Sequence, residues 1–144
     1  MIKTTRIVLI MLFAIILSSC SNTAKKFIVP TPAAGKANVS GRIVSINTGE
    51  PYIDATIRLA EVYRNELGEG AYALDAALSP QTTTNDQGNF VFTDIDPRDY
   101  VLIIGDPMTR YVIVADDTGK AIVYSCPVDQ VTDLGEHKID FDPQ

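Results

Sequence analysis

Residues 84–102 decide the fold of this chain, and they read TNDQGNFVFTDIDPRDYVL. The segment 85–88 predicts a tight turn, because Asn and Asp tolerate left-handed backbone and Gly adopts it without steric cost. Residues 89–93 then alternate polar and apolar side chains, which places Phe90 and Phe92 on one face of a strand. A break at 96–99 precedes a nearly all-apolar strand at 100–104. The stretch therefore predicts a turn, a strand, a second turn and a second strand.

The same pattern continues on both sides of this stretch. We expect strands at 39–45, 53–63, 81–84, 111–114, 121–126 and 138–141, separated by turns such as 47–51, 105–107 and 116–119. Closely spaced turn signals without a long amphipathic helix predict an all-β domain, an antiparallel sandwich or barrel, over residues 37–144. One stretch departs from the pattern. Residues 65–79 are rich in Ala and Leu in their second half and predict either a short helix or a structured loop.

The beginning of the chain is typical of a secretory signal peptide. Lys3 and Arg6 precede an apolar run at 7–17, and Ser18, Ser19 and Cys20 follow it. The run is too short for an ordinary membrane-spanning helix, although an uncleaved N-terminal anchor is the alternative. Residues 17–20 resemble the lipobox of bacterial lipoproteins. The resemblance implies a signal helix in residues 1–19, cleavage before Cys20, and a diacylglyceryl group with a palmitate-type acyl chain on that cysteine.

Two acyl chains attach a protein stably to a membrane, so the lipid on Cys20 is the expected membrane partner. We expect the protein on the extracytoplasmic side of the cell membrane or outer membrane, and Ser21 after the cysteine favours the outer membrane by resemblance to sorting patterns. Residues 20–36 then form the lipidated cysteine and a flexible tether. The apolar patch 27–29 within it rests either on the lipid or on the domain.

Charge and cysteine content narrow the function classes. The formal net charge is −6, and removal of residues 1–19 takes away Lys3 and Arg6 but no acid, which leaves −8. An acidic domain does not favour nucleic acid, which attracts basic surfaces. With Cys20 lipidated, only Cys126 remains, so no intramolecular disulfide is expected. The domain must then be stabilised by its apolar core, and we expect a monomer.

Four further motifs resemble the carboxypeptidase regulatory-like domains. Residues 39–44 with 48–57 are similar to the opening strands of that family, 84–92 to its T-D-x-x-G-x-F-x-F hairpin, 97–102 to its P-G-x-Y-x-L turn, and 133–139 to its closing strand. The resemblance implies a transthyretin-like (prealbumin-like) Greek-key sandwich of about seven strands. Arg98 and Asp54 stand where the family usually has Gly. By analogy with tyrosine corners, Tyr100 is expected to point inward and donate to a turn.

Few residues suggest chemistry. His137 is the single histidine and lies between charged neighbours, so we expect it exposed on a strand, and Cys126 reads as a small core residue. No catalytic constellation can be assembled, which predicts no enzyme and no cofactor. Asp94, Asp96 and Asp99 are candidates for Ca²⁺, although turns favour Asp for local hydrogen bonds and no metal is expected.

The sequence therefore predicts a non-catalytic, lipid-anchored cell-surface protein whose sandwich is a structural or interaction module. The alternative is a module that binds a carbohydrate or peptide, a surface glycan or protein, through the 65–79 loop. In that case Tyr72 and Asp75 are the candidate ligand-binding residues. The plainer interpretation of this loop is an insertion that caps one end of the sandwich with Tyr72, Leu74 and Leu78. Tyr72 beside a concavity would favour the alternative, and Tyr72 and Leu74 buried against the sandwich would oppose it.

Overall fold

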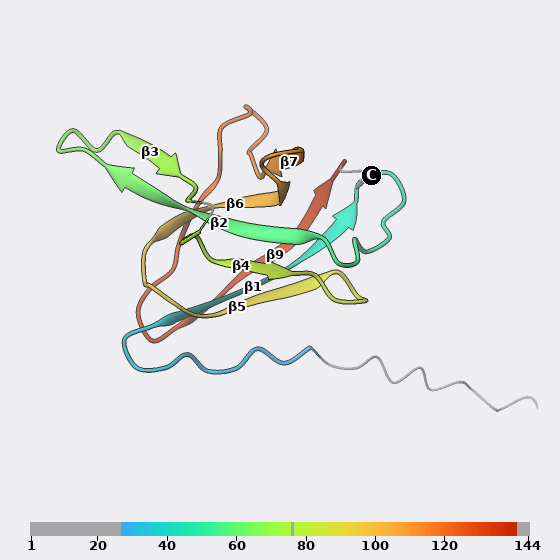
Figure 1. The fold of residues 1–144 in the computed structure, drawn as a ribbon, viewed down its shortest axis with the longest axis horizontal. Coiled ribbons are helices and arrows are strands. Elements are labelled where there is room, and N and C mark those ends of the chain that lie inside the picture. Colours follow the sequence, from blue (N-terminus) through green and yellow to red (C-terminus); the bar gives the residue numbers. More distant parts are fainter. Residues whose placement is uncertain (1–26, 76, 141–144) are drawn as a thin grey trace, which may run out of the picture.

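The computed structural model describes residues 27–75 and 77–140. The signal peptide, Cys20 and the first part of the expected tether lie outside the described residues. The described part is all-β, with two sheets packed face to face (Figure 1). Within it, no helix is long and apolar enough to span a bilayer. The predicted all-β sandwich is confirmed.

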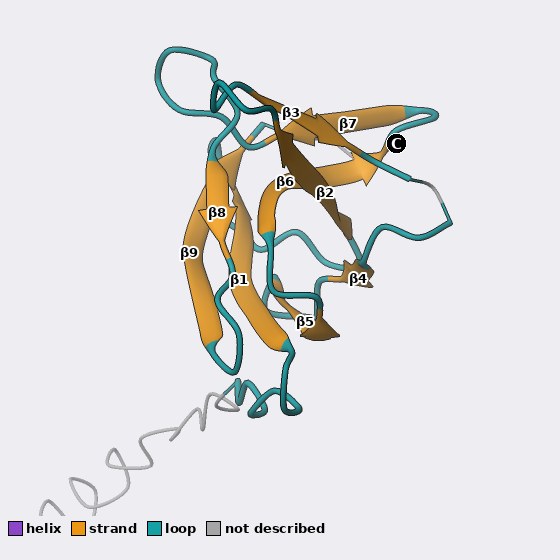
Figure 2. Ribbon diagram, turned by 90° about the vertical axis from the view of Figure 1, so that its left-hand side faces the viewer, coloured by secondary structure: helices purple, strands orange, loops and turns teal. Residues whose placement is uncertain are grey.

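The smaller sheet has three strands in the order β5-β1-β9. They are β1 (Ala37–Ser45), β5 (Asn89–Ile95) and β9 (Val131–Ile139). Strand β1 pairs with β5 in antiparallel fashion but with β9 in parallel, so the expectation of a wholly antiparallel sandwich is wrong at this pair. Figure 2 shows β1 and β9 side by side.

The larger sheet has six antiparallel strands, with β3, β2, β6 and β7 in that order. They are β2 (Thr56–Arg64), β3 (Gly70–Ala73), β6 (Asp99–Asp106) and β7 (Arg110–Ile113). Two short strands complete it: β4 (Gln81–Thr83) pairs with β2, and β8 (Val123–Ser125) pairs with β6. The described residues thus hold nine strands, where the family resemblance implied about seven.

The core lies between the sheets, and residues of alternating position fill it from both sides. Phe90 and Phe92 are buried as predicted, with their rings edge to face and their centroids 5.9 Å apart. The main apolar members are Val39, Ile43, Ile57, Leu59, Phe90, Phe92, Tyr100, Leu102 and Ile104. Cys126 is buried with them, as expected of a small core residue.

The turn at 85–88 forms as the sequence predicts. The side-chain oxygen Oδ1 of Asn85 accepts hydrogen bonds from the backbone N–H groups of Gln87 and Asn89, each at 2.9 Å. Gly88 has a φ of 76°, and a Cβ there would lie 2.5 Å from the carbonyl oxygen of Ile43. Both the conformation and the close approach therefore require glycine at this position.

The structure decides between the two alternatives for 65–79. The stretch contains no helix among its described residues; it is a structured connection that turns back and adds β3 to the edge of β2 as a hairpin. A second local prediction is wrong in its details. The strand expected from Ile53 begins only at Thr56, because Asp54 has a φ of 54° and Ile53 remains exposed. Left-handed backbone at Asp54 interrupts a strand at that point.

Residues 27–36, expected to be part of a flexible tether, instead lie across the outer face of the β5-β1-β9 sheet (Figure 1). The backbone N–H of Ala33 donates to Asp94 Oδ1 at 2.7 Å, and that of Gly35 donates to Asp129 Oδ1 at 2.6 Å. The side chain of Asn38 donates to the carbonyl of Pro30 at 2.8 Å. We call residues 27–36 the docked segment. Phe27 and Val29 line a concavity with Gly41 and Asn89 of that sheet, whereas Ile28 between them is 75% exposed.

Candidate functional site

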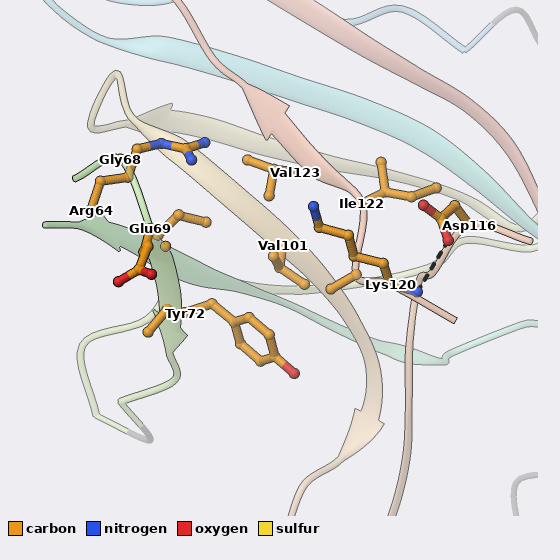
Figure 3. A pocket seen from close by; sticks show the side chains of 13 residues that line it. Arg64, Gly68, Glu69, Tyr72, Val101, Asp116, Lys120, Ile122 and Val123 are labelled. Atoms are coloured by element: carbon orange, nitrogen blue, oxygen red, sulfur yellow. Dashed lines mark hydrogen bonds between the residues drawn. The ribbon is translucent and has the colours of Figure 1, made fainter. Parts of the chain in front are cut away.

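A groove of about 750 Å³ lies on the face of the six-stranded sheet that points away from the core (Figure 3). Its floor is apolar and comes from three strands: Val62 of β2, Val101 of β6 and Val123 of β8. One wall is the β2–β3 hairpin, including Tyr72. The other wall is the segment that leads from β7 into β8 and carries Lys120. The sandwich thus presents a concave surface in addition to its closed core.

Tyr72 reaches this groove because of its register. It pairs with Val62 across β2 and β3, and directly paired residues point to the same side of a sheet. The hairpin is closed by Asn65, whose Oδ1 accepts from the N–H groups of Leu67 and Glu69 at 3.0 and 2.9 Å. Tyr72 is 43% exposed, so an aromatic face is available to a ligand. The predicted site residue Tyr72 therefore lies in a concavity and is not buried beneath the hairpin.

The facing wall is a turn built around Asp116. Its Oδ1 accepts from the Thr118 hydroxyl at 2.6 Å, from the Thr118 N–H at 2.9 Å and from the Lys120 N–H at 3.1 Å. The bond from the Thr118 hydroxyl is the main reason that the pKa of Asp116 is lowered. These bonds hold the turn that positions Lys120. The sequence alone did not identify Lys120 as a candidate site residue.

The charged side chains of the groove differ in whether they already have a hydrogen-bond or ion-pair partner. The guanidinium of Arg64 pairs with Asp99 at 3.1 Å, and the carboxylate of Glu69 accepts from the side chain of Asn65 at 2.8 Å. In Figure 3 the side chain of Lys120 extends over the floor towards Val101 and Val123. Within residues 27–75 and 77–140, no carboxylate lies at ion-pair distance from the Lys120 ammonium. Lys120 is therefore a cation available to a ligand.

The second candidate residue, Asp75, lies elsewhere. It lines a smaller concavity of about 380 Å³ together with Tyr63, Leu78 and Tyr100. Its carboxylate accepts from the N–H groups of Ala77 and Leu78 at 2.8 and 3.0 Å, so it stabilises the loop after β3. The structure does not bring Tyr72 and Asp75 into one site, and only Tyr72 faces the larger groove.

The three candidate Ca²⁺ ligands have separate partners. Asp94 accepts from the docked segment, Asp96 pairs with Lys36 at 2.8 Å, and Asp99 pairs with Arg64. The hydrogen bond and charge of Lys36 lower the pKa of Asp96. Among the residues that the structure describes, no three His, Cys, Asp or Glu side chains gather into a group that could hold a metal ion. These aspartates fix loops and the docked segment.

His137 and Cys126 occupy apolar surroundings. The expectation of an exposed His137 is wrong: its imidazole is half-buried, edge to face with Tyr124 at 5.9 Å, and burial lowers its pKa. Burial also raises the pKa of the Cys126 thiol to about 11, which keeps the sulfur protonated and weakly nucleophilic. Tyr100 is buried, and its hydroxyl donates to the carbonyl of Asp96 at 2.9 Å, as the tyrosine-corner analogy predicts.

No family model matches the chain, and no curated protein matches it. A DUF3823 family protein from Bacteroides uniformis is similar at 16% identity and a TM-score of 0.44, over 72% of this chain and 42% of that one. The major pilin subunit of Bacillus cereus is similar at 11% identity and a TM-score of 0.44, over 76% of this chain and 30% of that one. A 9R-lipoxygenase from Cyanothece is similar at 16% identity and a TM-score of 0.43, over 81% of this chain and 19% of that one. This chain spans less than half of each, and likeness at these TM-scores carries no argument about function.

Proposed function

We propose that this chain is a non-catalytic, lipid-anchored surface protein whose sandwich is a ligand-binding module, with the groove as its binding face. The observation that carries the proposal is the position of Tyr72 beside an apolar floor and opposite the ammonium of Lys120, which has no ion-pair partner among the described residues. A flat aromatic ring, an apolar surface and a few charged groups are the usual lining of a small-molecule site. A purely structural module would not need this exposed combination.

We further propose that residues 37–144 form a domain of the carboxypeptidase regulatory-like family. It is supported by the hydrogen bond from Tyr100 to the carbonyl of Asp96 and by the left-handed backbone of Asp54, which stands where that family has Gly. Arg98, the other departure from the pattern, does not need positive φ and forms an ion pair with Glu61. The turn chemistry of the family motifs is thus compatible with the residues present here.

The non-catalytic role rests on the chemistry of the groove. Its charged lining residues are Arg64, Glu69, Asp116 and Lys120, and it contains neither histidine nor cysteine. Asp116 is occupied by the bonds of its own turn, and its lowered pKa makes it a poor general acid or base. A bound molecule would therefore meet groups that can hold it, without a nucleophile and base in hydrogen-bond reach of each other.

A binding screen on the full-length chain with Cys20→Ala tests the groove. This variant leaves every described residue in place and is expected to lack the lipid. We expect it to bind members of a glycan array and Tyr72→Ala to lose that binding. Tyr111→Ala is the matched control, because Tyr111 is an exposed strand tyrosine outside the groove. Equal binding by both tyrosine variants would place the ligand elsewhere.

The anchor is tested by metabolic labelling with palmitate. The full chain should incorporate the label, Cys20→Ala should not, and Cys126→Ala should label normally because that thiol is buried in the core. Label retained by Cys20→Ala would overturn the lipoprotein proposal. That result would leave the groove proposal intact, since the two rest on different residues.

A further inference from the structure

We propose that the groove selects an acidic oligosaccharide, with a sugar ring against Tyr72 and its carboxylate or sulfate on Lys120. This inference rests on the proposed binding function and names the chemical class of its ligand. Several backbone amides of the groove walls are already engaged. The N–H groups of Glu69 and Ile122 already donate to Asn65 Oδ1 and to the carbonyl of Val114, at 2.9 and 3.0 Å.

Two further wall amides are engaged in the same way. Gly68 donates to the carbonyl of Asn65 at 3.0 Å, and Lys120 donates to Asp116 Oδ1 at 3.1 Å. The groove also crosses the face of a sheet, where backbone groups pair within the sheet itself. An extended peptide that adds to a sheet needs free backbone groups along a strand edge. The groove therefore presents side chains to its ligand, which favours a sugar over a peptide strand.

The side chains present define what the ligand must carry. The Tyr72 ring and the valines of the floor are flat or apolar and match the C–H face of a pyranose ring. Lys120 is a cation without an ion-pair partner among the described residues, and Arg64 uses its Nη2 for Asp99. Both carboxylates of the lining are engaged, Glu69 by Asn65 and Asp116 by Thr118 and Lys120. Both carboxylates keep their negative charge, so the groove has no general excess of positive charge, and an acidic ligand would be recognised through local contact with Lys120.

An anionic ligand must still approach a chain of net charge −6. Repulsion from distant carboxylates is screened within about 10 Å at ordinary salt, whereas a contact with Lys120 over an apolar floor is screened much less. Selectivity should consequently come from contact with the groove and not from long-range steering. Removing the one lysine should then have a large effect although other lysines remain on the surface.

The experiment measures binding of tetragalacturonate and of its fully methyl-esterified counterpart to the full-length chain with Cys20→Ala, by calorimetry. A sulfated galactose tetramer distinguishes sulfate from carboxylate as the source of the charge. We expect one of the two acidic probes to bind about tenfold more tightly than the uncharged ester. The ester comparison leaves the protein unchanged, so it does not depend on the folding of a variant.

Lys120→Gln should remove this preference, because it keeps length and hydrogen bonding but loses the charge. Lys138→Gln on the opposite sheet is the matched control and should bind like the parent chain. Equal binding of acid and ester, unchanged by Lys120→Gln but lost in Tyr72→Ala, would overturn the inference and leave the proposed function standing. Binding of hexaglutamate in place of both acidic sugars would overturn it in favour of a peptide. No binding of any array glycan or probe would overturn both.

Discussion

The ring of Phe90 covers Gly41 across the β1–β5 pair, so that a Cβ added at Gly41 would lie 2.6 Å from Phe90 Cζ. Gly41 thus leaves the space into which the aromatic ring packs. Because Phe90 is 1% exposed and packed on all sides, it has little freedom to move away. This contact couples the first strand of the domain to the stretch that begins at residue 84.

Gly41→Ala should destabilise the domain by about 1–3 kcal/mol, the usual cost of overpacking a core. Urea denaturation gives the free energy of unfolding. Gly70→Ala is the control, since a Cβ there would meet its neighbours no closer than 3.5 Å, and it should be nearly neutral. In the double variant with Phe90→Leu, part of the loss from Gly41→Ala should disappear. Strict additivity of the two changes would show that the ring is not the obstacle.

The local part of the fold could be predicted from the sequence. Phe90, Phe92, the 85–88 turn and the Tyr100 hydrogen bond all depend on neighbours within a few positions, which alternation and turn residues reveal. The alternation of its flanking residues predicts that Asp54 lies within a strand. The structure instead has left-handed backbone there, a conformation that alternation of side chains does not reveal.

The groove could be predicted only in part. Tyr72 was visible as an aromatic in an unusual connection, but its facing wall comes from the segment between β7 and β8, which is distant in sequence. Lys120 follows a Gly in a hairpin turn and has the appearance of an ordinary surface lysine. His137 was expected to be exposed because its neighbours are charged. It is half-buried because Tyr124 of β8 packs against it from the other sheet.

The docked segment should be released by loss of one acceptor. In Asp94→Gly the carboxylate that accepts from Ala33 is removed, while the left-handed backbone at φ 55° is retained without strain. Amide hydrogen exchange at Ala33 should accelerate about tenfold, in line with one lost hydrogen bond to a charged group. Asp94→Asn keeps an acceptor oxygen and should retain most of the protection. Unchanged exchange in Asp94→Gly would mean that the other contacts suffice.

Tyr100→Phe should cost about 0.5–1.5 kcal/mol by removing the bond to the Asp96 carbonyl. Burial raises the pKa of Tyr100 to about 12, above its ordinary value of 10.0. The folded state therefore retains the proton longer than the unfolded chain, and this contribution to stability is complete below pH 10 and lost between about pH 10 and 12. Stability of the parent chain should fall more steeply there than that of Tyr100→Phe. Parallel curves for the two proteins would contradict the role of the buried hydroxyl.

His137 is the one histidine of the chain. Burial lowers the pKa of His137 in the folded state, so near pH 6 the unfolded chain binds more protons than the folded one. The resulting stability is present above the ordinary pKa of 6.5 and is lost as the pH falls through the lowered folded value. Replacement by Phe keeps a ring against Tyr124 but cannot titrate.

The free energy of unfolding should therefore fall less between pH 7.5 and pH 5 in His137→Phe than in the parent chain. Carboxylates also titrate towards the acid end of this range, but they are the same in both proteins, and subtraction leaves the histidine alone. The difference between the two curves should be constant near pH 7.5 and above, and should shift in favour of His137→Phe as the pH falls towards 5. Curves that run parallel from pH 7.5 to pH 5 would show that His137 has the same proton affinity in the folded and unfolded chain, and that its imidazole is solvated despite its packing against Tyr124.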